Sequence, residues 1–431
     1  MIHKADAMKN SFLFLMTLLV ACGLKAQEFA QISTGSSYGN QAFYTLANDG
    51  VTSVANEDWD LAFFLGPDAT GIHFNEATTS TFGAPAPYLE VYLAPGADFD
   101  LPVDPASLMD TLYNPESTWN EGAFNVVRDL NNPQDVGWGL ANLSDGSVMG
   151  NRVFVIKLRD NSYRKLTFSQ QSGGVYTLRH AELDGTDEVV VIVDPADYAG
   201  SMLAFYSFSD IQPFAAPSGW DMTFLRYRQL LFDGNQPLQY AVTGILTAPG
   251  VEVAQADNVD VASALFESYK DSLQDRIDII GEDWKYFNLS AFSWEIAENR
   301  AYFLRLPDNH IWKLEFVDFE GSSTGTATFI KYDLGVVTSV NDPTGHFSSF
   351  GVFPNPVTGR ELNIVYSLTS ASEALTFSVF DLTGRHLYST NLHPHEGLNG
   401  ATVTLPNCPS GLYQVVLGQG VDRVTELVMF N

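Results

Sequence analysis

The most constraining feature of this sequence is a stretch that occurs twice at a constant separation. Residues 151–180 return as residues 299–332, and matched residues lie 148 positions apart throughout. The matched dipeptides are Asn151-Arg152 with Asn299-Arg300, Asp160-Asn161 with Asp308-Asn309, and Lys165-Leu166 with Lys313-Leu314. Because a constant spacing marks one shared structural unit, we interpret the chain as an internal duplication.

Each copy has the pattern of a three-stranded antiparallel meander. Phe154, Ile156 and Leu158 follow a period of two, as expected for a strand with one buried face. An Asp-Asn turn, a second alternating run, a Gly/Ser cluster and a third run follow in both copies. This order predicts two successive hairpins in each copy.

Shorter matches extend the duplication upstream. They are 58–63 (DWDLAF) with 219–224 (GWDMTF), 93–96 (LAPG) with 247–250 (TAPG), 137–143 with 283–289, and Phe43-Tyr44 with Phe205-Tyr206. The offsets of the first three, 161, 154 and 146, drift as expected when surface loops change in length. We therefore predict two homologous units, 28–192 and 193–340, with the same order of elements.

Both units are predicted to be mainly β, with antiparallel strands and one short helix each. Tyr, Phe, Val and Thr recur at period two between Gly, Pro, Asn and Asp, which favours strands and turns. The helices are expected at 262–279 and near 107–113, where Asp104-Pro105 supplies a cap and a first turn. The predicted repeat core is Trp59, Trp138, Trp220 and Trp284, with Asp60 and Asp221 turned toward solvent or backbone donors.

The N-terminus has the pattern of a secretory signal peptide. Lys9 precedes an apolar run at 12–21, which is about half the length that a membrane-spanning helix needs. Ordinary cleavage after Ala26 and lipidation at Cys22 are both compatible with the sequence. We favour cleavage after Ala26, because a lipid would hold the protein in a membrane before the export inferred below.

The charge of the chain restricts its partners. Removing residues 1–26 takes away three lysines and one aspartate, which leaves 19 basic and 50 acidic residues and a net charge of −31. Such a surface repels polyanions, so nucleic acid and anionic bilayers are poor partners. The mature chain keeps Cys408 alone and cannot form an internal disulfide, so packing must stabilise it.

The repeated units resemble the HmuY-like proteins of Bacteroidota. The resemblance rests on 56–63 (NEDWDLAF), on Gly219-Trp220-Asp221 with Phe224-x-Arg226-Tyr227, on 240–253 (YAVTGILTAPGVEV) and on the meander at 302–316. It implies an all-β, extracellular, non-enzymatic fold, and the founding members capture haem through axial side chains. Haem is therefore the cofactor that the resemblance suggests, although function resides in a site and not in a fold.

Three histidines are the candidate haem ligands before the linker. His73 lies in an alternating strand, His180 ends a meander strand and His310 occupies a hairpin turn, so they stand at non-equivalent positions of the repeat. Axial ligation needs two side chains on opposite faces of the macrocycle. We therefore expect no pair of these histidines to converge and haem to bind weakly or not at all, while tyrosines and methionines leave haem binding open.

Enzyme and metal signatures are weak. Two G-x-S-x-G sequences, 35–39 and 321–325, lack the buried strand and following helix that a nucleophile elbow needs. The chain contains no H-E-x-x-H, no P-loop and no Cys/His cluster with metal-binding spacing. Loop 129–135 (DLNNPQD) could supply oxygen ligands to calcium, but its spacing favours a solvated turn.

The last part of the chain resembles a type A C-terminal sorting domain of the type IX secretion system. After a linker at 341–349, residues 350–431 contain short alternating runs that predict an immunoglobulin-like sandwich. The motif residues are Pro354, Asn355, Pro356, Asp381, Gly384, Arg385, Gly411 and Tyr413. The final strand has Arg423 and Glu426 where a lysine is often seen. The resemblance implies the type IX machinery as a partner, export through the periplasm to the cell surface or medium, and no transmembrane segment in the mature chain.

These sequence features leave three classes of function. A displayed binding module for a porphyrin, another apolar ligand or a glycan is favoured by the resemblance and by the many Tyr and Phe residues. A structural or adhesive surface protein is favoured by duplication without identifiable chemistry. An enzyme is the least favoured, because it would need a cluster of perturbed carboxylates in a cleft.

Overall fold

The computed structural model describes residues 28–66, 69–78, 88–232, 234–336, 347–357, 359–368, 374–381, 385–406, 408–419 and 422–430. The signal-peptide predictions at Ala26 and Cys22, and the motif residue Gly384, lie outside these residues. Contacts divide the chain into two compact units at the bond between Gly335 and Val336. No helix in the described ranges is both long and apolar enough to cross a membrane.

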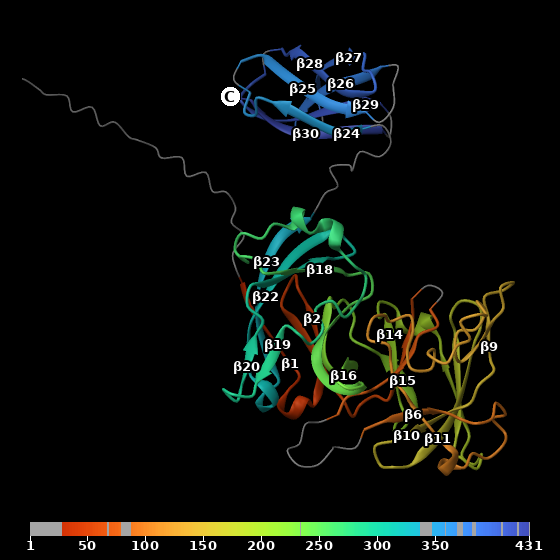
Figure 1. The fold of residues 1–431 in the computed structure, drawn as a ribbon. Helices are drawn as coiled ribbons and strands as arrows, with labels where there is room; N and C mark the ends of the chain where they lie inside the picture. Colours follow the sequence, from red (N-terminus) through yellow and green to blue (C-terminus); the bar gives the residue numbers. More distant parts are fainter. Residues whose placement is uncertain are drawn as a thin grey trace, which may run out of the picture. The chain divides into compact units, whose positions relative to one another are not determined.

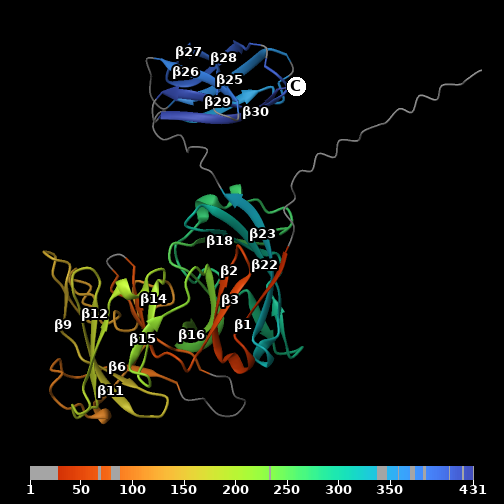
Figure 2. The same ribbon diagram turned by 180° about the vertical axis from the view of Figure 1, so that it is seen from behind.

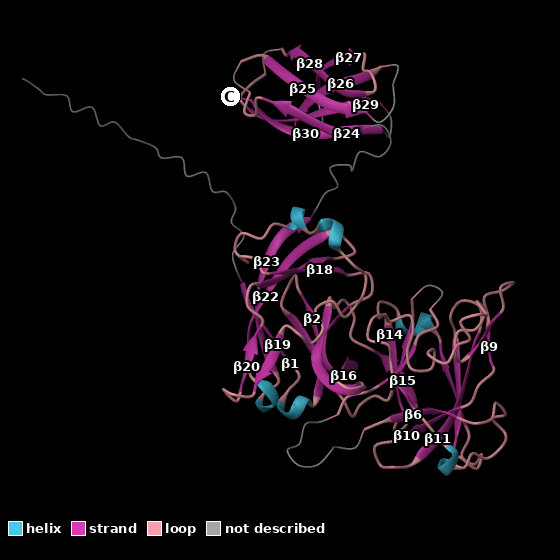
Figure 3. Cartoon of the chain, viewed as in Figure 1, coloured by secondary structure: helices cyan, strands magenta, loops and turns pink. Residues whose placement is uncertain are grey.

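The first unit consists of antiparallel sheets, which confirms the predicted mainly β fold (Figures 1 and 3). One outer sheet has the order β1 (Glu28–Ser33), β23 (Thr326–Val336), β22 (His310–Phe319), β21 (Arg300–Arg305) and β18 (Glu252–Asp257). The other outer sheet has the order β13 (Val189–Val193), β12 (Tyr176–Ala181), β11 (Tyr163–Gln170), β10 (Phe154–Lys157), β6 (Glu90–Leu93) and β7 (Thr111–Leu112), joined by β8 (Gly139–Ala141) and β9 (Val148–Gly150).

Two further sheets, which we call the central sheets, contain the paired beginnings of the repeats. The first is β15 (Gln212–Ala215), β14 (Leu203–Ser207), β4 (Leu61–Phe64) and β5 (Ile72–Phe74). The second is β17 (Pro237–Thr247), β16 (Met222–Phe232), β2 (Asn40–Thr45) and β3 (Gly50–Ala55). A separate hairpin is formed by β19 (Lys285–Asn288) and β20 (Ser293–Ile296).

Both predicted meanders are present and share one register. Phe154 pairs with Leu166, and Tyr302 pairs with Leu314, 148 positions further along. The buried lysine beside each pair serves the same purpose: Lys165 Nζ donates to the carbonyl of Leu101 at 2.9 Å, and Lys313 Nζ donates to that of Val261 at 2.7 Å. Each ammonium thus satisfies a carbonyl of the segment that covers its sheet.

The two repeats exchange strands. β1 and β2 pair with β23 and β16 of the second repeat, whereas β14 of the second repeat pairs with β4 of the first. Figure 1 shows β1 and β2, in red, beside the green and cyan strands, and Figure 2 shows β14 and β15 with the yellow strands. Strand pairing therefore crosses the predicted boundary at 192/193, since β2 pairs with β16 and β14 pairs with β4.

The register corrects one of the sequence matches. In the first repeat Leu93 pairs with Phe154, and in the second repeat Gln255 pairs with Tyr302. Since Phe154 and Tyr302 are matched residues of the duplication, Leu93 corresponds to Gln255. Thr247 instead corresponds to Phe74, because these residues end the equivalent strands β17 and β5. The match of 93–96 with 247–250 is therefore wrong, since Ala-Pro-Gly is a turn sequence that recurs wherever a strand must end.

The predicted helices are absent from the described residues, which contain only 3-10 turns. In 262–279 the turns are Phe266–Ser268 and Lys270–Ser272. The Asp104 cap is formed, with its carboxylate accepting from Ala106 N at 2.9 Å, but it closes only Pro105–Ser107. The remaining 3-10 turns are Ser36–Tyr38, Pro195–Tyr198 and Gly321–Ser323. Apolar residues at helical spacing were misleading here because they pack beside an outer sheet, as Phe266 and Tyr269 do against Phe303.

The core joins the two central sheets. Phe43 of β2 and Phe205 of β14 contact each other with ring centroids 6.4 Å apart. Trp59 stacks on Phe205 at 4.4 Å, and Trp220 meets Phe43 edge-on at 5.2 Å. Trp138 and Trp284 are fully buried under the outer sheets.

The second unit is an antiparallel sandwich of two sheets. One sheet is β24 (Phe347–Phe353), β25 (Glu361–Leu368) and β28 (Gly397–Thr404). The other is β27 (His386–Leu392), β26 (Leu375–Asp381), β29 (Gly411–Gln419) and β30 (Asp422–Phe430). β24 begins at Phe347, within the predicted linker 341–349.

Candidate functional site

Two adjacent hollows form the candidate site, and they share the lining residues Phe74 and Arg228. The outer groove has a volume of about 170 Å³ and is lined by Tyr88, Tyr92, Tyr113, Glu90, Leu89, Thr111 and Leu112 in addition to the shared pair. The inner cavity, of about 50 Å³, lies at the junction of the central sheets. Since a water molecule occupies about 30 Å³ in the liquid, the groove could hold several waters or a small organic group.

Arg228 occupies the groove because β16 is longer than its counterpart. The β16–β17 ladder has eleven residue pairs, whereas the equivalent β4–β5 ladder has three. The extension carries Arg228 to the rings of Tyr88 and Tyr113, whose centroids lie 5.1 and 5.5 Å from its guanidinium carbon. Two cation–π contacts therefore hold the guanidinium in place.

Arg228 also lacks a carboxylate partner. Eight of the ten arginines between residues 28 and 336 form an ion pair with Asp or Glu, and Arg226 and Arg228 are the two to which no described residue supplies one. In a chain with 51 acidic and 22 basic residues this is unexpected. An arginine left without a carboxylate in such a chain is a candidate ligand-binding residue.

Glu76 connects the inner cavity to the groove. Its two oxygens accept hydrogen bonds from the backbone N–H groups of Asn114 at 2.9 Å and Arg228 at 3.1 Å. Burial raises the pKa of this carboxyl to about 7, against the hydrogen bonds and the Arg228 charge, which favour the anion. The side chain therefore keeps its proton to a higher pH than an ordinary glutamate does.

Unpartnered polar atoms also lie in residues that line the inner cavity. Gln41 Oε1 and Trp59 Nε1 are buried and have no hydrogen-bond partner among the described residues. Native proteins rarely leave such atoms unsatisfied, so water or a ligand atom is expected there.

The three histidines contact different partners. His73 on β5 is buried, with Nε2 3.0 Å from the Trp119 carbonyl, and burial lowers its pKa to about 4. His180 on β12 lies 2.7 Å from the Tyr206 hydroxyl, and burial lowers its pKa to about 4 as well. His310 begins β22 and contacts Asp333 at 2.6 Å. Only His73 lines either hollow.

The Trp-Asp motifs have a structural role that links the repeats. Asp60 accepts a hydrogen bond from Phe208 N at 2.8 Å, and Asp221 accepts one from Leu46 N at 2.7 Å. Each carboxylate thus caps the strand contributed by the other repeat. Asp60 also pairs with Arg159, which belongs to the turn between β10 and β11.

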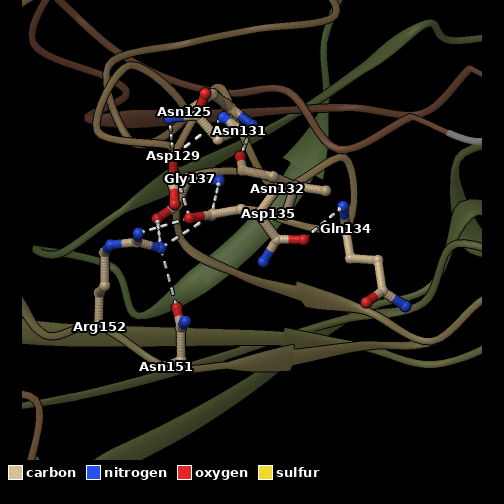
Figure 4. Close-up of polar contacts among 10 residues, drawn as sticks. Asn125, Asp129, Asn131, Asn132, Gln134, Asp135, Gly137, Asn151 and Arg152 are labelled. Carbon is tan, nitrogen blue, oxygen red and sulfur yellow. Dashed lines mark hydrogen bonds and ion pairs between the residues drawn. The ribbon is translucent and has the colours of Figure 1, made fainter.

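Loop 129–135, the alternative calcium site, is tied to Arg152 by an ion pair from Asp135 (Figure 4). Asp135 binds Arg152 through both oxygens, at 2.6 and 2.8 Å, and accepts from the backbone N–H groups of Asp129 and Gly137 at 2.9 Å. The loop is therefore more than a solvated turn. Across the described ranges, no three His, Cys, Asp or Glu side chains gather as a metal site requires.

The two G-x-S-x-G loops pack against each other at the point where β1 joins β23. Thr34 N donates to the Gly325 carbonyl at 3.1 Å, and Ser33 Oγ donates to that of Thr324 at 2.7 Å. Each loop contains only a short 3-10 turn. A nucleophile elbow opens a helix, and neither loop does.

The described sorting-motif residues organise the C-terminal sandwich. Asn355, between Pro354 and Pro356, donates to the Leu427 carbonyl at 2.9 Å and accepts from Met429 N at 3.0 Å. The carboxylate of Asp381 accepts from the backbone and side chain of Arg385, which closes the turn after β26. β29 begins at Gly411, and Tyr413 donates to the Pro409 carbonyl at 2.9 Å.

The fold and these motifs define an exported, mainly β protein with a sorting domain. Residues 351–430 match the family described as "Secretion system C-terminal sorting domain", which directs export by the type IX secretion system to the cell surface or the medium. A comparison with curated proteins gave no match.

Solved structures give remote similarities. Dimeric latent PorU from Porphyromonas gingivalis is 10% identical, with a TM-score of 0.17, over 66% of this chain and 31% of PorU. The chain thus spans about a third of that protein. A truncated trimeric ectodomain of the fusion protein EFF-1 from C. elegans is 10% identical, with a TM-score of 0.16, over 94% of each chain. Trypsin-activated alpha-2-macroglobulin from Escherichia coli is 10% identical, with a TM-score of 0.16, over 89% of this chain and 36% of that one.

Sequence reasoning did not assign a site to the residues that line the two hollows. The available signal was the failure of the repeat at these positions. Glu76 follows β5 where the second repeat has Pro249 after β17, and Arg226 and Arg228 alternate on a strand far longer than its counterpart. Structural residues such as Asp60 and Asp221 are duplicated, whereas these are not.

Proposed function

We propose that residues 28–336 form a non-enzymatic binding module that the cell displays or releases, and that holds a small ligand in the outer groove. The observation that carries this proposal is Arg228, a guanidinium placed between two tyrosine rings at the junction of two hollows. Binding sites typically combine an aromatic lining with a few fixed polar groups. The groove is smaller than the roughly 300–1,000 Å³ of sites that enclose drug-sized molecules, so it suits a small ligand or one part of a larger ligand.

A thermal-shift screen of the exported protein tests this proposal. Saccharides, nucleotides, amino acids, aromatic acids and haemin are added separately, and at least one class should raise the melting temperature, because binding to the folded state alone stabilises it. Tyr113→Ala should abolish that rise. The control Tyr286→Ala removes a tyrosine that is 53% exposed on β19, outside both hollows, and should keep the rise. A screen without a stabilising class, or a rise that survives Tyr113→Ala, would contradict the proposal.

The HmuY-like resemblance keeps haem binding as a separate hypothesis. We propose that haem binds weakly or not at all, because His73, His180 and His310 each have a ring nitrogen in a contact with a different protein group. Titration with haemin, followed through the Soret band, measures this directly. A low-spin bis-histidine spectrum that His180→Ala abolishes would restore the haem hypothesis.

An adhesive function is the second candidate, and the β19–β20 hairpin favours it. Tyr286, Leu289 and Phe292 are 53%, 82% and 75% exposed. On the equivalent β8–β9 hairpin, Leu143 and Met149 are 79% and 77% exposed. Exposed apolar patches often mark interaction surfaces. Replacing Leu289 and Phe292 with serine should reduce retention of the protein on polysaccharide-coated beads, while Tyr113→Ala should leave it unchanged. Equal retention of both variants would remove this candidate.

A further inference from the structure

We infer that the outer groove selects small organic anions, in which one negatively charged group is attached to a flat ring, and that Arg228 binds the charged group. This inference rests on the proposed binding function and names the chemical class of the ligand. It depends on charge complementarity, on preorganisation and on the lining of the groove.

Arg228 has no carboxylate partner among the described residues, although the chain has more than two carboxylates for every basic residue. Its guanidinium stays over the rings of Tyr88 and Tyr113. A planar guanidinium offers a fork of N–H donors that matches a carboxylate, sulfate or phosphate, and stacking on a ring leaves the donors at its edge available.

The acidic residue that lines the groove, Glu90, and the neighbouring Glu76 of the inner cavity are already engaged. Glu90 accepts a hydrogen bond from the Tyr92 hydroxyl and pairs with Lys157 at 3.5 Å. Glu76 accepts two backbone hydrogen bonds and is fully enclosed, which favours its neutral form. Glu116, which lines the inner cavity, does not line the groove. Arg228 therefore determines the charge preference of the groove.

The other lining residues explain why the ligand should contain a flat ring. Phe74, Leu89 and Leu112 supply apolar surface, and Tyr88, Tyr92 and Tyr113 supply flat rings with hydroxyl groups at their ends. Rigid aromatic side chains bind flat bodies at a low cost in conformational entropy. The volume of about 170 Å³ is enough for one ring.

Three probes that share one ring and differ in charge test this inference on the exported protein: benzoate, benzamide and benzylamine. Calorimetry should show benzoate binding at least tenfold more tightly than benzamide, with benzylamine the weakest, because hydrogen bonds between two charged groups are stronger than those to a neutral group. Glucuronate and glucose form a second pair, which distinguishes a sugar ring from an aromatic ring. Inorganic sulfate alone should displace benzoate only weakly.

Variants then assign the effect to Arg228. Arg228→Gln should reduce benzoate affinity at least tenfold and leave benzamide unchanged, and Arg228→Lys should keep part of the preference because it keeps the charge. Arg305→Gln is the control, since Arg305 is half-buried and pairs with Glu252 on the far outer sheet. The melting temperature of each variant shows whether it folds. The probe series on the unaltered protein tests the charge preference even if a variant does not fold.

Four outcomes would overturn the inference. They are equal binding of benzoate and benzamide, a preference for benzylamine, a benzoate preference that survives Arg228→Gln, and no binding of any charged ring. Displacement of benzoate by sulfate at equal concentration would also remove the requirement for a ring. In each case the thermal-shift screen decides separately whether the groove binds another class, so failure of this inference is distinguishable from failure of the proposed function.

Discussion

Phe43 and Phe205 occupy equivalent strands of the two repeats and touch each other, with ring centroids 6.4 Å apart. The contact marks a pseudo-twofold relationship between the central sheets. The hydrogen bonds that Asp60 accepts from Phe208 N and that Asp221 accepts from Leu46 N follow the same pseudo-twofold relationship. Because each repeat completes the sheets of the other, the duplication produces one body with two interlocked halves.

This interlocking predicts that neither repeat folds alone. A fragment of residues 28–192 loses the β14 partner of β4, and a fragment of 193–336 loses β1, β2 and β3. Both fragments should lack the near-ultraviolet circular dichroism of packed aromatic rings, and the intact 28–336 fragment should show it and unfold in one transition. Independent cooperative unfolding of 193–336 would refute the exchange.

Phe205→Ala should destabilise the first unit by roughly 3–5 kcal/mol, since it removes a buried ring that contacts Phe43 and Trp59. Urea unfolding of the exported protein measures this change. Phe232→Ala is the matched control, because that ring is 70% exposed at the end of β16 and should change the free energy of unfolding by no more than about 0.5 kcal/mol. A similar loss in both variants would mean that Phe205 is not part of the core.

Glu76 should make stability fall as the pH rises. Its folded-state pKa of about 7 lies above the ordinary value of 4.5, so the folded protein keeps a proton that the unfolded chain loses first. The loss of folding stability caused by ionising this buried carboxyl is absent below pH 4.5, grows between pH 4.5 and 7, and reaches on the order of 3 kcal/mol above pH 7.

Glu76→Gln should remove this dependence, because glutamine does not titrate. The free energy of unfolding of both proteins is measured in urea from pH 5 to pH 8, and only the difference in slope counts, since glutamine also loses one acceptor oxygen. Parallel curves would show that the carboxyl titrates normally in the folded protein.

Deleting residues 350–431 should trap the protein inside the cell envelope, because the sorting domain directs export. Immunoblots of envelope and medium fractions measure its location. Leu398→Ser, which alters a side chain that is 68% exposed in that domain, should leave export unchanged. Normal release of the truncated protein would contradict the sorting role.

The local pattern of the sequence was sufficient for the meanders and for the sorting domain. Period-two alternation and Asp-Asn turns predicted β10 to β12 and β21 to β23, because strand and hairpin signals depend on near neighbours in the chain. The same reasoning failed at 262–279, where apolar spacing alone cannot distinguish a helix from an irregular segment packed on a sheet. It also failed at 93–96, where a turn sequence resembled a repeat.

What the sequence by itself determined was therefore the mainly β class, the duplication and the destination of the protein. Tertiary structure alone decided which strands pair across the repeats, that Asp135 binds Arg152, and that Arg228 lies between Tyr88 and Tyr113. The physical reason is separation along the chain. Arg228 is brought to its tyrosines by long-range pairing and by the length of one hairpin, and neither leaves a local signal in the residues that form the groove.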